Sequence, residues 1–174
     1  FSYEESYGYM LGDYVRDKDA VTASLLLTEM AAWYQSQGMT LFDALQALYE
    51  KYGYYGEKTH NLVMPGLDGL EKMAALMKNL RDVPPTEIAG VAVTARTDYK
   101  DGTITDCKTG KVTASELKGS NVLRYTLADG TVILVRPSGT EPKIKVYILT
   151  LGKDAGDRDA NIEKYSQWAL ALQN

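Results

Sequence analysis

Cysteine and histidine are almost absent from this chain, which has one of each among its 174 residues. A single cysteine, Cys107, cannot form a disulfide within the chain, and this favours a reducing compartment such as the cytoplasm. The single histidine, His60, is accompanied by neither a second histidine nor a cluster of cysteines. The sequence therefore argues against a zinc site. No grouping of serine, histidine and aspartate suggests a nucleophilic triad.

Long apolar runs and an excess of positive charge are also missing. No apolar stretch approaches the ~18 residues that a membrane-spanning helix needs. The net charge of −4 argues against general binding to nucleic acid or to a membrane surface, so any anion site must be local. The first residues do not form a signal peptide and lack an initiator methionine. We therefore expect a piece of a longer protein.

The composition that remains is globular, with 45% hydrophobic and 24% charged residues, and it is organised in periodic segments. The sequence predicts a first helix that is capped by Asp17 or Asp19 and ends before Gly38. A second helix begins with the capping pattern Thr40–Asp43 and ends before Gly53. Both helices have broad apolar faces, and the segment is short, so we expect them to need a partner surface.

A second domain is predicted to follow a hinge near residues 51–56. Its expected elements are a strand over 54–65, a helix that Asp68 opens and Pro84-Pro85 ends, and a strand over 88–97. The polar segment 99–119 carries no clear element. A hairpin around Asp129-Gly130, a strand over 143–151 and a helix over 157–172 complete the chain. This order predicts an α+β fold, an antiparallel sheet with helices on one face, and domains at 1–53 and 54–174.

The most informative stretch is Arg-Pro-Ser-Gly-Thr-Glu-Pro, residues 136–142, between two strand-like runs. A loop of small residues leaves backbone N–H groups free to converge on an anion, and a guanidinium fits phosphate oxygens bidentately. The following strand can add positive charge through Lys143 and Lys145, which share one face. An ordinary turn would have a similar composition. The predicted phosphate-binding residues are Arg136, Ser138, Gly139, Thr140 and Lys145.

A second constellation lies at the start of the chain, in Tyr3-Glu-Glu-Ser-Tyr-Gly8. Carboxylates accept hydrogen bonds from vicinal hydroxyl groups, and a serine hydroxyl donates or accepts, so the segment suits a sugar. An acidic surface turn is the alternative that the residues alone leave open.

The string Arg136 to Lys145 resembles the C-terminal phosphate-binding loop of the α-D-phosphohexomutases, the phosphoglucomutase and phosphomannomutase superfamily. The start of the chain is similar to the sugar-binding loop of their third domain, with Glu4 and Ser6 at matching positions and Glu5 in the variable place. Lys18 matches a lysine that faces the active site in this family. Tyr3 departs from the family's glycine, as in one bacterial branch of phosphoglucomutases, and the Glu-Glu-Ser form is typical of enzymes acting on glucose phosphates.

The resemblance covers the whole chain and implies that residues 1–53 end the third domain. Residues 54–174 would then form the fourth domain, which in this family resembles the TATA-binding-protein fold. The family's phosphoserine motif, Ser-His-Asn or Ser-His-Asp, and its magnesium loop, Asp-Gly-Asp-x-Asp-Arg, do not occur here. The resemblance therefore implies substrate-binding residues without catalytic or metal-binding ones, and an isolated chain without activity. Mg²⁺ and a hexose 1,6-bisphosphate would serve the full-length enzyme.

The implied function is interconversion of glucose 1-phosphate and glucose 6-phosphate through a phosphoserine and a bisphosphate intermediate. The loop at Arg136 would hold the phosphate that is not reacting, while Glu4 and Ser6 hold sugar hydroxyls. The missing N-terminal domains of the same chain would be its partners. A phosphomannomutase or phosphopentomutase of the same superfamily is an alternative. A stand-alone binding module is another, since a TATA-binding-protein-like fold can bind nucleic acid, although the acidic balance argues against it.

Overall fold

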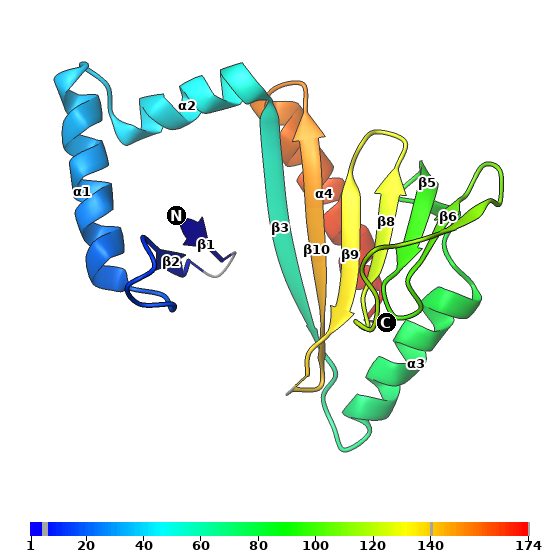
Figure 1. The fold of residues 1–174 in the computed structure, drawn as a ribbon. Helices are drawn as coiled ribbons and strands as arrows, with labels where there is room; N and C mark the ends of the chain where they lie inside the picture. Colours follow the sequence, from blue (N-terminus) through cyan, green and yellow to red (C-terminus); the bar gives the residue numbers. More distant parts are fainter. Residues whose placement is uncertain (5–6, 140, 174) are drawn as a thin grey trace. The chain divides into compact units, whose positions relative to one another are not determined.

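The computed structural model describes residues 1–4, 7–139 and 141–173 of the chain. The chain divides into two units, Phe1–Tyr52 (unit 1) and Gly53–Asn174 (unit 2), and each is described here by itself. Unit 1 begins with two short antiparallel strands, β1 (Ser2–Tyr3) and β2 (Tyr9–Met10). Two helices follow them, α1 (Ala20–Ser36) and α2 (Leu41–Tyr52), as Figure 1 shows.

Both helices of unit 1 begin at the caps that the sequence predicts. Asp19 is the N-cap of α1, and its carboxylate accepts hydrogen bonds from the N–H groups of Val21 and Thr22 at 2.9 and 3.4 Å. Thr40 and Asp43 form a reciprocal capping box at the start of α2. The Thr40 N–H donates to the Asp43 carboxylate at 2.8 Å, and the Asp43 N–H donates to the Thr40 hydroxyl at 3.1 Å.

The apolar face of α1 is exposed along its length. No residue of α1 is buried, and Leu25, Leu27 and Trp33 are each more than half exposed. A groove of about 690 Å³ runs beside this face. The described residues of unit 1 therefore do not supply the partner surface that the sequence predicts for these helices.

Unit 2 is built on one antiparallel sheet, which has eight strands in the described part of the chain. The strands lie in the order β3-β10-β9-β8-β5-β6-β7, and β4 pairs with β5 beside this path. Figure 1 looks onto the sheet. The bounds are β3 (Tyr54–Val63), β4 (Glu87–Ile88), β5 (Val91–Asp98), β6 (Thr103–Asp106), β7 (Val112–Ala114), β8 (Leu123–Leu127), β9 (Val132–Pro137) and β10 (Lys143–Gly152).

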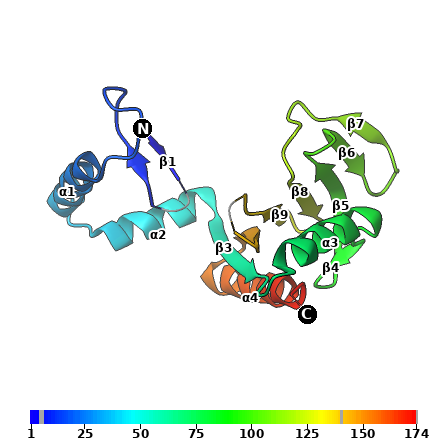
Figure 2. The same ribbon diagram turned by 90° about the horizontal axis from the view of Figure 1, so that it is seen from below.

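Two helices, α3 (Gly69–Asp82) and α4 (Ala155–Ala171), lie on the same side of this sheet, as Figure 2 shows. Alternate residues of the strands face these helices and are fully buried, which is the period-two pattern of a sheet with one covered face. Most of the core comes from β3, β8, β9, β10, α3 and α4. The expected α+β fold with helices on one face is confirmed. The other face carries no helix from the described residues of unit 2.

Side chains of the helices also tie them to the sheet by polar contacts. Arg81 of α3 donates to the Asp98 carboxylate of β5 from Nε, at 2.7 Å, and from Nη2, at 3.3 Å. The hydroxyl of Tyr165 in α4 donates to the carboxylate of Asp129, in the turn between β8 and β9.

No helix among the described residues combines the length and the apolar character that crossing a bilayer requires.

Two expectations for unit 2 were wrong. The strand predicted over 88–97 is broken at Ala89-Gly90, where both residues have positive φ and the chain turns to pair β4 with β5. The segment 99–119 is not without structure, because it contains β6 and β7, which continue the sheet. Their residues are largely polar and the strands are short, so hydrophobic alternation does not reveal them.

Candidate functional site

The sugar-binding loop predicted at the start of the chain is a turn between β1 and β2. The N–H of Glu4 donates to the carbonyl of Gly8 at 2.8 Å, and the N–H of Tyr7 donates to the carbonyl of Glu4 at 3.3 Å. Tyr7 has a φ of 65°, an uncommon conformation for a residue other than glycine. Ser6 and the variable Glu5 lie outside the described residues. These main-chain hydrogen bonds hold the backbone of Glu4, from which its carboxylate side chain extends.

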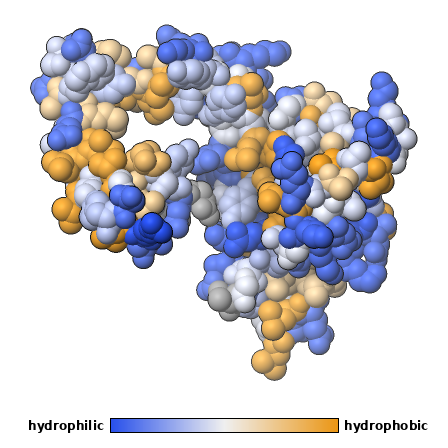
Figure 3. Space-filling model, in the orientation of Figure 1, coloured by the Kyte–Doolittle hydropathy of each residue, from blue (hydrophilic) through white to orange (hydrophobic). Residues whose placement is uncertain are grey.

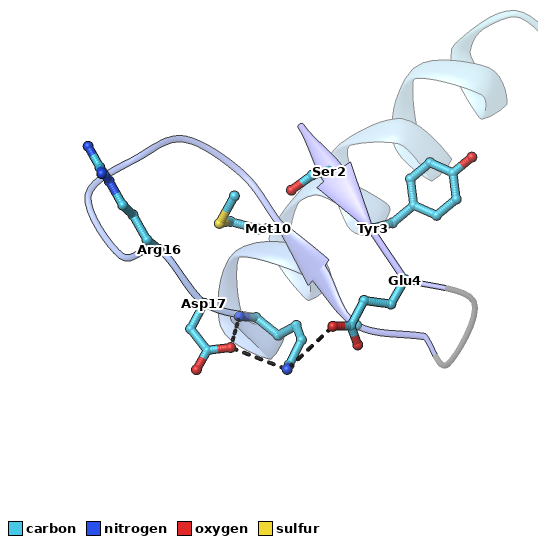
Figure 4. A pocket seen from close by; sticks show the side chains of 8 residues that line it. Ser2, Tyr3, Glu4, Met10, Arg16 and Asp17 are labelled. Atoms are coloured by element: carbon cyan, nitrogen blue, oxygen red, sulfur yellow. Dashed lines mark hydrogen bonds and ion pairs between the residues drawn. The ribbon is translucent and has the colours of Figure 1, made fainter. Parts of the chain in front are cut away.

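Lys18 and Glu4 are brought together from the two ends of this region. The Lys18 Nζ lies 3.5 Å from the Glu4 carboxylate and 3.4 Å from that of Asp17 (Figure 4). The N–H of Lys18 also donates to Asp17, at 2.7 Å. The hydrogen bond with Asp17, followed by the charges of Asp17 and Glu4, raises the pKa of Lys18 above its ordinary value. The side chains of Lys18 and Glu4 are about half exposed, so both can reach a ligand.

A pocket of about 210 Å³ lies beside the Glu4–Lys18 pair. Ser2 and Met10, on neighbouring strands, line it together with Arg16 and Asp17. In Figure 4 the Arg16 side chain extends away from Glu4. The residues that line the pocket thus include two carboxylates, two cations and the hydroxyl-bearing Ser2 and Tyr3, a set of groups that can bind sugar hydroxyls.

The predicted phosphate-binding loop joins β9 to β10, and main-chain hydrogen bonds hold it at both ends. The N–H of Ser138 donates to the carbonyl of Lys143 at 2.8 Å. The N–H of Met64, just after β3, donates to the carbonyl of Pro142 at 2.8 Å. Gly139 is exposed, and a Cβ built on it would have no neighbour within 4 Å. A ligand can therefore approach the backbone closely at this glycine.

Arg136 and Lys145 are direct cross-strand partners in the β9–β10 ladder. Both belong to the face of the sheet opposite the helices, since their neighbours Val135, Ile144 and Val146 are fully buried on the helical side. Figure 3 looks onto this open face and shows hydrophilic side chains gathered over its lower part. Cβ atoms of residues directly opposite each other lie about 4.5–5.5 Å apart, so the two cationic side chains start from neighbouring points.

Lys143 belongs to the same face of the sheet as Lys145. Its ammonium group forms an ion pair with the Glu141 carboxylate within the loop. The hydrogen bond and charge of Lys143 lower the pKa of Glu141. Lys143 therefore ties the loop to the strand, and less of its charge is available to an anion. Thr140, the remaining predicted residue of this loop, lies outside the described residues.

Sequence reasoning does not predict two of the contacts of Lys18, those with Asp17 and with Gly8. Asp17 contacts Lys18 and was considered only as a helix cap. Gly8 leaves room for Lys18, because a Cβ built on it would lie 2.6 Å from the Lys18 Cγ. The adjacency of Asp17 and Lys18 in the sequence was a usable signal, whereas the contact of Gly8 depends on how the loop folds. Within the described ranges, no group of three or more histidine, cysteine, aspartate or glutamate side chains could hold a metal ion.

An antiparallel sheet with helices on one face, and a loop of small residues beside the paired cations Arg136 and Lys145, define an α+β module. The comparisons with known proteins identify its class. Residues 61–150 match the family model of the phosphoglucomutase/phosphomannomutase C-terminal domain. Residues 1–52 match that of the α/β/α domain III of the same family. The chain therefore belongs to the phosphoglucomutase/phosphomannomutase family.

Named relatives agree with this assignment. The chain is 39% identical over 167 residues to the phosphoglucomutase of Staphylococcus haemolyticus (strain JCSC1435), covering 96% of this chain and 29% of the relative. It is also 39% identical over 150 residues to the phosphoglucomutase of Staphylococcus aureus (strain bovine RF122 / ET3-1), covering 85% of this chain and 27% of the relative. The chain thus spans less than a third of the length of these curated relatives.

A solved structure has a similar fold. It is the open form of the exocytosis-sensitive phosphoprotein pp63/parafusin, a phosphoglucomutase from Paramecium, with a TM-score of 0.54 and 16% identity. The match covers 98% of this chain and 30% of that protein. At this identity the likeness concerns the fold alone.

Proposed function

We propose that this chain is the substrate-binding, C-terminal portion of a phosphoglucomutase that interconverts glucose 1-phosphate and glucose 6-phosphate. The observation that carries the proposal is the direct opposition of Arg136 and Lys145 beside the loop at residues 137–142. Like charges that face each other across a ladder are unfavourable, and an anion bound between them removes the repulsion. The relatives named above are phosphoglucomutases, which favours glucose phosphates over mannose or pentose phosphates.

The residues of unit 2 would act as a clamp on one phosphate group. Arg136 would bind two phosphate oxygens with its planar fork, and Lys145 would add a point charge. Ser138 and Thr140 would donate hydroxyl hydrogen bonds, while the open surface at Gly139 lets backbone N–H groups approach the phosphate. We call these five residues the phosphate clamp.

The residues of unit 1 would recognise the sugar. The Glu4 carboxylate can accept hydrogen bonds from two neighbouring hydroxyl groups, and Ser6 can donate or accept one more. Lys18 would bind an oxygen of the substrate while its contact with Asp17 holds it near Glu4. Fixing a substrate in this way is a main part of phosphoryl-transfer catalysis, because the transferred group needs accurate alignment more than covalent help.

The reaction requires a clamp that does not itself react. A phosphoserine of the longer protein would give its phosphoryl group to one end of the sugar phosphate, and the resulting bisphosphate would turn over and return a phosphoryl from the other end. In both orientations the clamp would hold the phosphate that is not reacting. The longer protein would use Mg²⁺ and a hexose 1,6-bisphosphate, and both the phosphoserine and the metal loop would belong to its N-terminal domains.

The domain assignment supports this division of labour. We propose that residues 1–53 complete a third domain and that residues 54–174 form a fourth, with a hinge near residue 53. The two family models, which match 1–52 and 61–150, support this boundary. Closure about the hinge would exclude water from a reactive phosphoserine. A cytoplasmic location is part of the same proposal and is supported by the single, exposed cysteine.

Phosphate binding to the 174-residue chain tests the clamp. In a titration with inorganic phosphate followed by amide NMR shifts, we expect a dissociation constant in the millimolar range. This corresponds to a binding free energy of about −4 kcal/mol. The shifts should centre on residues 136–145. Arg136→Ala should abolish binding, and Arg136→Lys should not restore it fully, because lysine lacks the bidentate fork. Shifts that centred elsewhere, or that persisted unchanged in Arg136→Ala, would mean that the loop is only a structural turn.

An activity assay tests the reaction assigned to the longer protein. A coupled assay that converts glucose 1-phosphate to glucose 6-phosphate should detect turnover by the full-length protein and only background with the 174-residue chain. Turnover by the purified chain would contradict the assignment of the phosphoryl-transfer groups to other domains. Turnover of mannose phosphates alone by the full-length protein would contradict the choice of sugar.

A further inference from the structure

A third cation shares the open face of the sheet with Arg136 and Lys145. Arg124 is the second residue of β8, and its neighbours Leu123 and Tyr125 are buried on the helical side. Alternation along the strand therefore puts Arg124 on the opposite face, the face of the phosphate clamp. Arg124 is only partly exposed on this face.

The strand register makes Arg124 a near neighbour of the clamp. Arg124 is the direct partner of Leu134, and Arg136 lies two residues further along the same strand, on the same face. Such diagonal neighbours are about 7–8 Å apart, a separation that long side chains can bridge. Two guanidinium groups that start from these positions can reach the same phosphate.

The described residues around Arg124 offer it no acidic partner. Neither the guanidinium of Arg124 nor that of Arg136 has a hydrogen bond or an ion pair with a described residue, whereas the guanidinium groups of Arg81 and Arg158 each contact a carboxylate. The direct cross-strand neighbours of Arg124 are Thr97 on β5 and Leu134 on β9, which carry no charge. A part-buried guanidinium without a carboxylate, next to a second one, raises the positive potential at this point of the face.

We propose that Arg124 is a further phosphate-binding residue, which extends the clamp from β9 and β10 to a third strand. The proposal rests on the function proposed above, since it adds a residue to the same site. Its guanidinium would share the charge of a dianionic phosphate with Arg136 and Lys145. The hydrogen bonds formed in this way are charge-assisted, and each is stronger than a bond between neutral groups.

Inorganic phosphate is the probe that tests this, with the 174-residue chain and the variants Arg124→Gln and Arg124→Lys. The dissociation constant should rise about tenfold in Arg124→Gln, the change expected when one charge-assisted hydrogen bond is lost. Arg124→Lys keeps the charge without the fork, so its dissociation constant should lie between those of wild type and Arg124→Gln. Lys111→Gln is the matched control. It removes one positive charge at an exposed position between β6 and β7, and it should leave the constant unchanged.

A measurement on the unaltered chain avoids any dependence on how the variants fold. The side-chain Nε–Hε NMR signals of Arg124 and Arg136 should both move during the phosphate titration, with the same dissociation constant. If the Arg136 signal moved and that of Arg124 did not, or if Arg124→Gln bound phosphate as wild type does, Arg124 would lie outside the clamp while the proposed function stood. If Arg136→Ala also bound phosphate normally, the proposed function itself would be wrong.

Discussion

Gly8 lies directly against the side chain of Lys18. A Cβ built on Gly8 would be 2.6 Å from the Cγ of Lys18, 2.7 Å from its Cδ and 3.0 Å from a carboxylate oxygen of Glu4. Real Cβ atoms do not approach other atoms so closely, so any side chain at this position must displace the lysine. The absence of a side chain at Gly8 thus allows Lys18 to take the position beside Glu4.

Gly8→Ala is therefore expected to weaken substrate recognition by moving Lys18. In the full-length protein, kcat/KM for glucose 1-phosphate should fall about tenfold, which corresponds to one lost charge-assisted contact. Lys18→Ala should cause a similar loss, and Gly8→Ala should add little in the Lys18→Ala background, because the two changes remove the same contact. Losses that simply added would indicate that Gly8 acts without Lys18.

Glu4→Gln is expected to damage sugar recognition, because an amide has one acceptor oxygen where the carboxylate has two. The loss should be about 1.5–3 kcal/mol, or at least tenfold in kcat/KM. Asp17→Asn is the matched control: it also removes a carboxylate next to Lys18, but from a residue with no proposed substrate contact, and it should cost less. A loss below about threefold for Glu4→Gln would rule out its role as a sugar-binding residue.

The contact between Tyr165 and Asp129 should contribute to the stability of unit 2. Tyr165 is fully buried, and its hydroxyl donates to a carboxylate in the turn between β8 and β9. Tyr165→Phe should lower the free energy of unfolding by about 1–3 kcal/mol, measured by urea denaturation. Tyr55→Phe should change it little, because Tyr55 is 60% exposed. Equal effects of the two substitutions would mean that the buried hydrogen bond contributes nothing specific.

His60 should make the chain less stable in mildly acidic solution. Its Nε2 lies 2.8 Å from the hydroxyl of Ser166, and burial, helped by the charge of Lys58, lowers its pKa below the ordinary 6.5. The unfolded chain therefore binds a proton at a higher pH than the folded chain does. Stability is lost as pH falls from 6.5 towards the lower folded-state pKa.

The single histidine allows a clean measurement of this effect. Urea denaturation between pH 7.5 and pH 5 should give a falling free energy of unfolding for the wild type and a flatter profile for His60→Gln. Ser166→Ala is a useful comparison, because it removes the hydrogen-bond partner and leaves the titrating group in place. A profile in His60→Gln as steep as that of the wild type would assign the pH dependence to other groups.

Local signals in the sequence were sufficient for the helices of unit 1. A side-chain cap acts within three residues, so Asp19 and the Thr40–Asp43 box can be identified without knowing the rest of the fold. The hairpin at Asp129-Gly130 is equally local, and the structure pairs Thr126 with Val132 across it.

Elements that depend on distant partners could not be predicted in the same way. The strands β6 and β7 are short and polar, and they are held by pairing with β5. The turn before β5 places Ala89 at a positive φ of 50°. Glycine or asparagine is the residue expected at such a φ, so an alanine gives no sign of this turn in the sequence. In both places the sheet determines a conformation that the local residues do not specify.

The residues of the candidate site also differ in whether the local sequence or only the sheet reveals them. The residues Glu4, Lys18 and Arg136 could be selected from contiguous motifs and from the resemblance that those motifs carry. Their roles as ligands remain predictions. The opposition of Arg136 to Lys145, and the nearness of Arg124, follow from the register of three strands, which the sequence does not contain in readable form.

All ten residues of β10 pair with β3, so the two strands form one long ribbon that should move as a unit. Gly152 pairs with Tyr54, next to the start of unit 2, and Lys143 pairs with Val63 at the end that carries the phosphate loop. Ten paired residues span about 30 Å, so a rotation of about 10° at Gly53 would carry the loop about 5 Å. Gly53 has a φ of 110°, which other residues rarely adopt. The proposed hinge at Gly53 and the predicted phosphate-binding loop after β9 would thus move together, although Gly53 and Lys143 are 90 positions apart in the sequence.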